Sequence, residues 1–152
     1  MVRQLAPWHE NLKKRQVKSP KIYIQDSGLL HSLLSISSRH ALLGHPKLSP
    51  SWEGFVLEQI LRGMPTRDCY FWATHSGAEL MIIRNGKRTG FEFKWNDAPK
   101  LTRSMKIVSA DLDLTEMYVV YPGTTSYPLA PNINVVPIKQ LSTIFPQKQV
   151  LQ

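Results

Sequence analysis

The order of three segments between residues 89 and 121 limits the fold more than any other feature of this sequence. Residues 89–95 alternate apolar with polar or charged side chains, as a strand with one buried face does. After Pro99, apolar residues recur at helical spacing, and residues 117–121 are then apolar throughout, which is typical of a central buried strand. A strand, a crossover helix and a buried strand in this order predict an α/β protein whose sheet contains a parallel pair.

Other segments complete a mixed central sheet flanked by helices. Strands are also predicted at residues 21–25, 69–72, 79–83 and 133–136, and Asn85-Gly86 is a strong hairpin-turn signal. Helices are predicted at residues 29–34, 52–62, 101–112 and 138–145, the first capped by Asp26 or Ser27 and the second by Ser51. The predicted apolar face of the second helix consists of Trp52, Phe55, Val56 and Ile60.

The N-terminal residues differ from the rest of the chain. Residues 1–20 show no clean hydrophobic period and contain Pro7 and Pro20. We therefore interpret residues 1–20 as an N-terminal arm, the remnant of an upstream module, and residues 21–152 as the domain.

The composition excludes several classes of protein. With 152 residues, 42% of them hydrophobic and 20% charged, the chain can bury one core and is neither disordered nor a coiled coil. The sequence has no apolar run of about 18 residues, which a transmembrane helix needs, so no membrane partner is expected. Its single cysteine, Cys69, cannot form an internal disulfide, so we expect a reducing, cytoplasmic location.

A formal net charge of +8 favours a polyanionic partner, and the charge is concentrated in two segments. Residues 1–22 carry six basic side chains against one acidic, and residues 84–106 carry seven against two. Short basic runs often only solvate a surface, so the interpretation as a nucleic-acid footprint gains support only if the two segments meet in space. Of the four tryptophans, Trp95 is the best exposed candidate for stacking on a base, although core packing is the commoner role. The residues predicted to contact nucleic acid are Lys94, Lys100, Arg103 and Lys106.

The candidate for chemistry is Glu92-Phe93-Lys94, in which two charged side chains share one face of an apolar strand. Such a carboxylate can bind a divalent cation while the lysine steadies a phosphate or a nucleophilic water, although an ion pair on a solvated face explains the same residues. Phosphodiester cleavage also needs acids on neighbouring elements, which Glu53 and Glu79 supply. The sequence predicts that these four charged residues converge on one side of the sheet as a catalytic set, with Glu79 and Glu92 as the metal ligands.

Helix, hairpin strand, E-x-K strand and basic helix follow one another here as in the PD-(D/E)xK nuclease core. The stretches that carry a resemblance to a known family are KSPKIYIQDSGL (18–29), WEGFV (52–56), FWATHSGAEL (71–80), GFEFK (90–94) and YPG (121–123). In this order they resemble the uncharacterised C-terminal domain of a large prokaryotic family of AAA-type ATP-binding proteins, from about residue 7 to residue 145. The resemblance implies a PD-(D/E)xK, restriction-endonuclease-like fold that follows an ATPase module.

Two departures from the family affect what the resemblance implies. The sequence has no G-x-x-x-x-G-K-[ST] phosphate loop, so we expect a stand-alone C-terminal piece without its ATPase and without a nucleotide-binding motif. The family pattern reads G-x-E-[LV]-D, and Met81 stands at the position of its Asp, the residue that matches the principal metal ligand. Mg²⁺ prefers hard oxygen donors, and a thioether is a poor ligand for it. Met81 therefore makes bound Mg²⁺ doubtful.

Three functions stay open at this point. The preferred hypothesis is a nuclease-fold binding or regulatory module, catalytically weak or inactive, that binds nucleic acid or a partner protein. The first alternative is an active Mg²⁺-dependent DNA endonuclease that uses the four charged residues. The second is an oligomerisation domain of an ATPase. Met81 separates the first two hypotheses, because it removes an oxygen ligand that hydrolysis needs.

Overall fold

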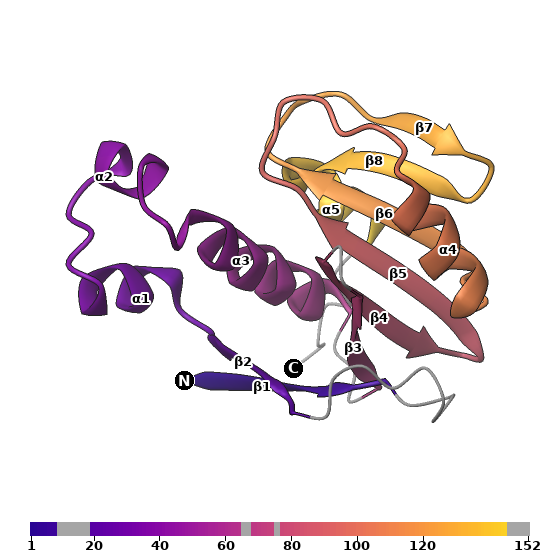
Figure 1. Ribbon diagram of the computed structural model, residues 1–152, viewed down its shortest axis with the longest axis horizontal. Coiled ribbons are helices and arrows are strands. Elements are labelled where there is room, and N and C mark those ends of the chain that lie inside the picture. Colours follow the sequence, from indigo (N-terminus) through magenta and orange to yellow (C-terminus); the bar gives the residue numbers. More distant parts are fainter. Residues whose placement is uncertain (9–18, 65–67, 75–76, 146–152) are drawn as a thin grey trace, which may run out of the picture.

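The computed structural model describes residues 1–8, 19–64, 68–74 and 77–145, without the side chains of residues 73–79. In this part of the chain, eight strands form one mixed sheet in the order β2-β1-β3-β4-β5-β6-β8-β7 (Figure 1). The strands are β1 (Val2–Pro7), β2 (Lys21–Ile24), β3 (Cys69–Thr74), β4 (Gly77–Arg84), β5 (Lys87–Phe93), β6 (Glu116–Tyr121), β7 (Tyr127–Ala130) and β8 (Ile133–Pro137). The helices are α1 (Ser27–Leu33), α2 (Arg39–Leu43), α3 (Leu48–Gly63), α4 (Arg103–Asp111), the 3₁₀ helix η2 (Ile138–Gln140) and α5 (Leu141–Ile144). The predicted α/β class, with a mixed sheet flanked by helices, is confirmed.

The predicted parallel pair is also confirmed. β5 and β6 run parallel with Glu92 beside Val119, and β8 runs parallel to β6 on its other side. β3, β4 and β5 are antiparallel neighbours, and both residues of the Asn85-Gly86 turn have positive φ, at 51° and 74°. The carboxyl ends of β5, β6 and β8 therefore lie at one edge of the sheet, which we call the carboxyl edge.

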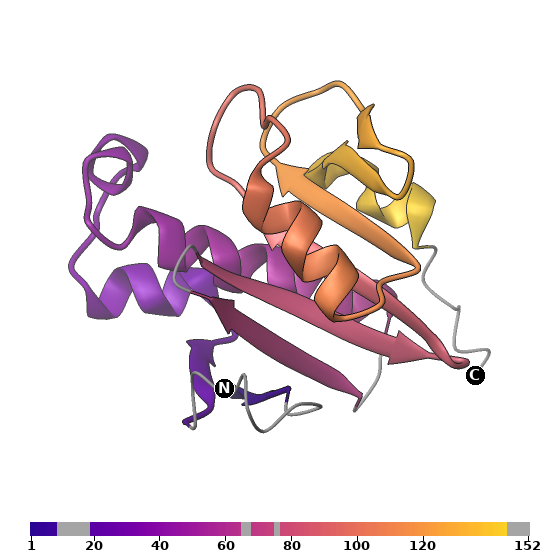
Figure 2. The same ribbon diagram turned by 45° about the vertical axis from the view of Figure 1, so that its right-hand side comes forward.

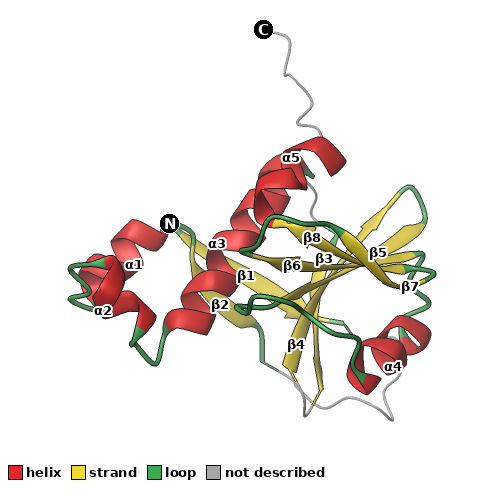
Figure 3. Cartoon of the chain, turned by 90° about the horizontal axis from the view of Figure 1, so that it is seen from above, coloured by secondary structure: helices red, strands yellow, loops and turns green. Residues whose placement is uncertain are grey.

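Helices cover the two faces of the sheet differently. Leu80 and Phe91 belong to the apolar cluster of α3, whereas Met81 and Val119 belong to the cluster of α4. Because side chains alternate along a strand, these clusters define an α3 face and an α4 face. Figures 2 and 3 show α4 on one side of the sheet and α3, with α5, on the other. In Figure 1, α1 and α2 project beyond the sheet, and neither helix contains a buried residue.

Residues 2–7 of the predicted N-terminal arm are part of the sheet. These residues form β1, which pairs antiparallel with β2 and parallel with β3 within the sheet. Leu5 belongs to the α3 cluster, and Arg3 forms a two-point ion pair with Glu58 of α3. The strand is hard to predict because Leu5 is its one buried side chain. Residues 9–18 lie outside the described part, so the boundary at residue 20 stays a prediction.

Helix α3 begins earlier than predicted and packs differently. It starts at Leu48, so Ser51 lies inside the helix rather than capping it, and Ser51 Oγ is 2.6 Å from His31 Nε2. Phe55, predicted to be buried, is 40% exposed, whereas Glu58 is buried. The reason is that β1 and β2 cover a flank of the helix that the sequence pattern assigns to solvent. A Cβ at Gly54, for example, would already touch Tyr23 of β2.

The remaining predicted elements are present with shifted ends. α1 and α4 are capped by Asp26 and Thr102, whose side chains accept hydrogen bonds from backbone amides three residues further on. The helix predicted at residues 138–145 is divided between η2 and α5, and β7 is an additional short edge strand. Among the described residues, no helix combines the length and the apolar character that crossing a bilayer requires.

The turn after β6 yields a first test of this packing. The hydroxyl of Tyr121 donates to the carbonyl of Thr125 and accepts from its amide, which holds the ring where a Cβ at Gly123 would lie. We expect Gly123→Ala to lower the free energy of unfolding by about 1–3 kcal/mol, because the added methyl enters filled space. Gly44→Ala is the matched control, expected to stay within about 0.5 kcal/mol, since no atom lies within 4 Å of its added Cβ. Urea unfolding of both variants measures the difference, and equal midpoints would contradict the prediction.

Candidate functional site

Glu92 and Lys94 lie together at the carboxyl edge of the sheet, as their spacing predicts. Lys94 Nζ is 2.5 Å from Glu92 Oε1, and the two side chains are 34% and 8% exposed. Glu92 Oε2 is buried and has no hydrogen-bond partner among the described residues. A buried carboxylate oxygen without a partner is costly, so this atom is the place at which a bound cation or hydrogen-bond donor would gain most.

Met81 lies on β4, the strand next to this pair. It is fully buried in the α4 cluster, and it pairs across the ladder with Gly90, two residues before Glu92 on the same face of β5. Met81, at the position where the resemblance implies an acid, therefore lies diagonally across the ladder from Glu92. In this chain the position is filled by a thioether packed among apolar side chains.

The structure does not bring Glu53 into contact with Glu92 and Lys94. Glu53 Oε2 accepts hydrogen bonds from Lys21 Nζ at 3.2 Å and from the Tyr23 hydroxyl at 3.3 Å, both on β2. Helix α3, which carries Glu53, covers the face of the sheet on which Phe91 lies. Because side chains alternate along β5, Glu92 points to the opposite face, the α4 face. Alternation along β5 thus separates the helix carboxylate from the strand carboxylate.

Glu53 belongs to a cluster of polar side chains on the α3 face, which links β2 to α3. Lys21, Tyr23 and Glu53 line a cavity of about 490 Å³ between β2, α1 and α3. Burial raises the pKa of the Tyr23 hydroxyl, while the neighbouring Lys21 ammonium acts in the opposite direction.

The location of the Glu79 side chain stays a prediction. The backbone of Glu79 lies in β4 opposite Trp72, but its side chain is outside the described part. Among the described residues, the oxygen donors beside Met81 therefore reduce to the carboxylate of Glu92, one oxygen of which is bound to Lys94. Mg²⁺ requires near-octahedral oxygen coordination, and the described donors do not fit it.

Basic residues surround the carboxyl edge. Lys100, Arg103 and Lys106 are exposed along the β5–α4 loop and α4, and Lys139 is exposed just after β8. Asp97 is an exposed acid in the same loop. In open α/β sheets, ligands bind outside the carboxyl ends of the parallel strands, so the location suits a ligand and the charge suits an anion.

The two basic segments meet at one described point, where the Arg88 guanidinium lies 5.4 Å from the centroid of the Trp8 ring. Arg3 and Lys21 are bound to Glu58 and Glu53, and Lys13, Lys14, Arg15 and Lys18 lie outside the described part. Arg84 and Lys87 lie at the β4–β5 turn, which is the end of β5 opposite to Lys94. The footprint beside the Glu92–Lys94 pair is therefore the carboxyl edge.

Sequence reasoning missed an aromatic pocket beside this edge. Trp52 contacts the rings of Trp95 and Phe55, with centroids 5.1 Å and 6.3 Å apart. With His31 and Ser51, these rings line a cavity of about 260 Å³, which we call the aromatic pocket. The sequence pattern assigns Trp52 and Phe55 to the core, and the exposed Trp95 was its one signal for such a pocket.

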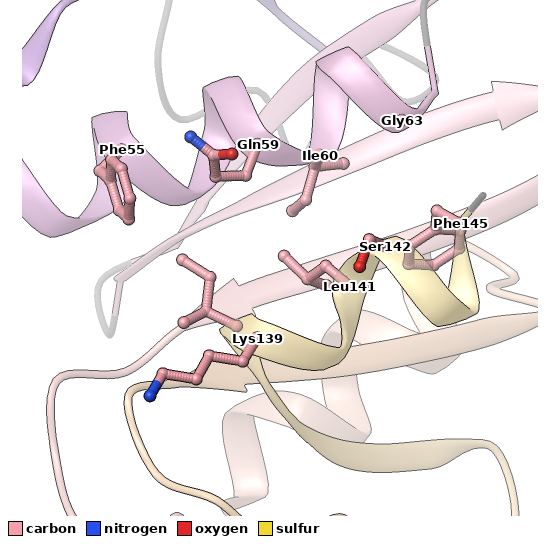
Figure 4. A pocket seen from close by; sticks show the side chains of 9 residues that line it. Phe55, Gln59, Ile60, Gly63, Lys139, Leu141, Ser142 and Phe145 are labelled. Atoms are coloured by element: carbon pink, nitrogen blue, oxygen red, sulfur yellow. The ribbon is translucent and has the colours of Figure 1, made fainter. Parts of the chain in front are cut away.

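Phe55 also joins the aromatic pocket to a second depression. Figure 4 shows this groove between α3 and α5, with Phe55 and Gln59 on α3 facing Lys139 and Leu141. The groove has a volume of about 360 Å³. Phe55 and Lys139 therefore line the same groove from opposite sides.

Most of the chain matches two families of domains. Residues 48–141 match the family described as "Domain of unknown function (DUF4143)", and residues 1–40 match "Domain of unknown function (DUF8612)". Two uncharacterized proteins, from Mycobacterium bovis and Mycobacterium tuberculosis, are each 46% identical to this chain over 145 residues, or 94% of it. The chain spans 33% of the length of these relatives. No solved structure matches.

Proposed function

We propose that this chain, which belongs to the DUF4143 family of domains of unknown function, is a nuclease-like module that binds nucleic acid and is catalytically weak or inactive. The observation that carries the proposal is the pair of the buried Glu92 and the partly exposed Lys94, which lies at the basic carboxyl edge on the strand next to Met81. The pair retains the charged residues of a nuclease centre, while its neighbour lacks the oxygen donor that cleavage requires.

The element order supports the nuclease-like part of the proposal. α3, the antiparallel strands β3, β4 and β5, then α4 and the parallel β6 follow one another as the PD-(D/E)xK resemblance implies. E-x-K stands at the end of β5, as it does in that resemblance. The proposal does not include Glu53 in the centre, because Glu53 faces Lys21 and Tyr23.

Charge favours nucleic acid over a protein partner at this edge. Lys100, Arg103, Lys106 and Lys139 provide four exposed cations beside the partly exposed Lys94. Contacts from lysine and arginine to phosphates release counterions, which gives binding a sequence-independent component that weakens with salt. A protein partner held mainly by apolar contacts has no such dependence.

The test measures binding of a labelled oligonucleotide as a function of salt concentration. We expect log K to fall linearly with log [salt], and the triple variant Lys100→Ala/Arg103→Ala/Lys106→Ala to lose roughly 2–3 units of this slope on duplex DNA. The control is Arg84→Ala/Lys87→Ala, which removes charge from the opposite end of β5 and should change the slope little. Absence of binding, or binding that is insensitive to salt, would overturn the nucleic-acid proposal and favour a protein partner or self-association.

A cleavage assay tests the catalytic part separately. We expect no cleavage of supercoiled or linear DNA with Mg²⁺ or Mn²⁺, because Met81 stands where the resemblance implies an oxygen ligand and a thioether binds these ions poorly. Cleavage by the unmodified protein that disappears in both Glu92→Ala and Lys94→Ala would replace the proposal with an active endonuclease.

A further inference from the structure

The aromatic pocket exposes rings that a folded domain would ordinarily bury. Phe55 is 40% exposed and Trp95 is 39% exposed, whereas Trp52, which both rings contact, is 8% exposed. Large aromatic side chains gathered at a cavity mark a binding site more often than singly scattered ones do. Trp52 forms the fixed part of this pocket, and Phe55 and Trp95 form its two accessible walls.

The size and lining of the pocket suit one planar ring system. Its volume of about 260 Å³ lies below the roughly 300–1,000 Å³ of pockets that take drug-sized ligands. Besides the rings, the wall contains Leu42, Leu48 and the pair of His31 and Ser51, which share a hydrogen bond of 2.6 Å. The wall is therefore mainly apolar, which suits the face of a planar ring.

A cation adjoins the pocket on one side. Lys139 lines the groove that shares Phe55 with the pocket, whereas Lys94 is bound to Glu92 on the opposite face of β5. A flat group joined to an anion matches this arrangement, and a nucleotide within a strand has that chemistry. Bases of single strands stack on aromatic side chains while basic residues follow the backbone, whereas bases in a duplex are already stacked and paired.

We infer that the aromatic pocket holds one unpaired nucleobase, between Trp95 and Phe55, so that the domain binds single-stranded nucleic acid in preference to duplex. This inference rests on the proposed nucleic-acid binding and adds the strandedness of the ligand. The carboxyl edge supplies contacts to phosphates, and the pocket supplies the contact to a base.

The test compares an oligo(dT) strand with a duplex of equal length at one salt concentration. We expect the unmodified protein to bind the single strand at least about tenfold more tightly, and Trp95→Ala to weaken that binding about 5- to 100-fold with little change in salt slope. Trp95→Phe keeps an aromatic face and should recover most of the affinity. The matched control is Ile107→Ala, which truncates an exposed apolar side chain on α4, 46% exposed, and should change neither affinity.

The outcomes separate the pocket from the proposed function. Salt-dependent binding with equal affinity for single strand and duplex, or with no effect of Trp95→Ala, would overturn the inference that the pocket holds a nucleobase. The proposed nucleic-acid binding would still stand. No binding of either nucleic acid would overturn both. Phe55→Ala repeats the test from the other wall, and thermal unfolding of each variant identifies a loss of affinity that reflects loss of structure.

Discussion

Met81→Asp should lower the free energy of unfolding by several kcal/mol when no divalent cation is present, and Mg²⁺ should restore part of that loss. Met81 is fully buried in the α4 cluster, and its side chain lies on the same face of the sheet as Glu92. An unpaired carboxylate in this place loses its hydration and meets a second carboxylate, and the effective penalty of burying one ion is several kcal/mol. A cation that binds both carboxylates would offset the penalty, by about 2.7 kcal/mol at a hundred times its dissociation constant.

Thermal unfolding with and without Mg²⁺ checks this prediction, and two control variants isolate its cause. Met81→Leu conserves volume and should cost less than about 1.5 kcal/mol without any response to Mg²⁺. Met81→Asn has the shape of the aspartate without its charge, so it should destabilise the fold but not respond to the cation. If Mg²⁺ fails to stabilise Met81→Asp, or stabilises the unmodified protein equally, the edge beside Glu92 is not a former metal centre.

The sequence predicts the central strands of the sheet better than it predicts the N-terminal strand. The apolar run at residues 117–121 and the Asn85-Gly86 turn carry strong local signals, and β6 and the β4–β5 hairpin lie where those signals place them. β1 has one buried side chain, Leu5, so its pattern does not differ from that of a loop. Its place in the sheet depends on long-range pairing with β2 and β3, which no local pattern reveals.

The candidate site was predictable only within one strand. A spacing of two residues places Glu92 and Lys94 on one face, and the structure brings them together. The side of the sheet that α3 covers is a tertiary property, and packing of Phe91 under α3 is what turns Glu92 away from Glu53. The aromatic pocket escaped prediction for a similar reason, because Trp95 and Trp52 are far apart in sequence and meet only where the end of β5 passes α3.

Glu58→Ala should be the second most destabilising of these substitutions, because it breaks the link between β1 and α3. Arg3 Nε and Nη2 donate to the two carboxylate oxygens of Glu58 at 2.7 Å and 2.8 Å, and the side chains are 29% and 10% exposed. Removing one partner of a largely buried pair leaves the other charge without compensation, which costs about 3–5 kcal/mol when burial is complete. Since Arg3 is partly exposed, we expect a loss of about 3 kcal/mol in urea unfolding.

The controls for this pair separate charge, geometry and position. Arg3→Lys keeps the charge but loses the planar two-point geometry, so it should cost part of the loss seen in Glu58→Ala. Arg62→Ala, on an exposed position of the same helix, should stay within about 0.5 kcal/mol. In a double-mutant cycle, Arg3→Ala and Glu58→Ala should cost less together than the sum of the two, because the second change removes a charge that the first has already left unpaired.

A loss below about 1 kcal/mol in Glu58→Ala would mean that β1 unfolds independently of α3. In that case the N-terminal strand would behave as the separate arm that the sequence pattern predicts, and the position of Trp52 on α3 would not depend on it.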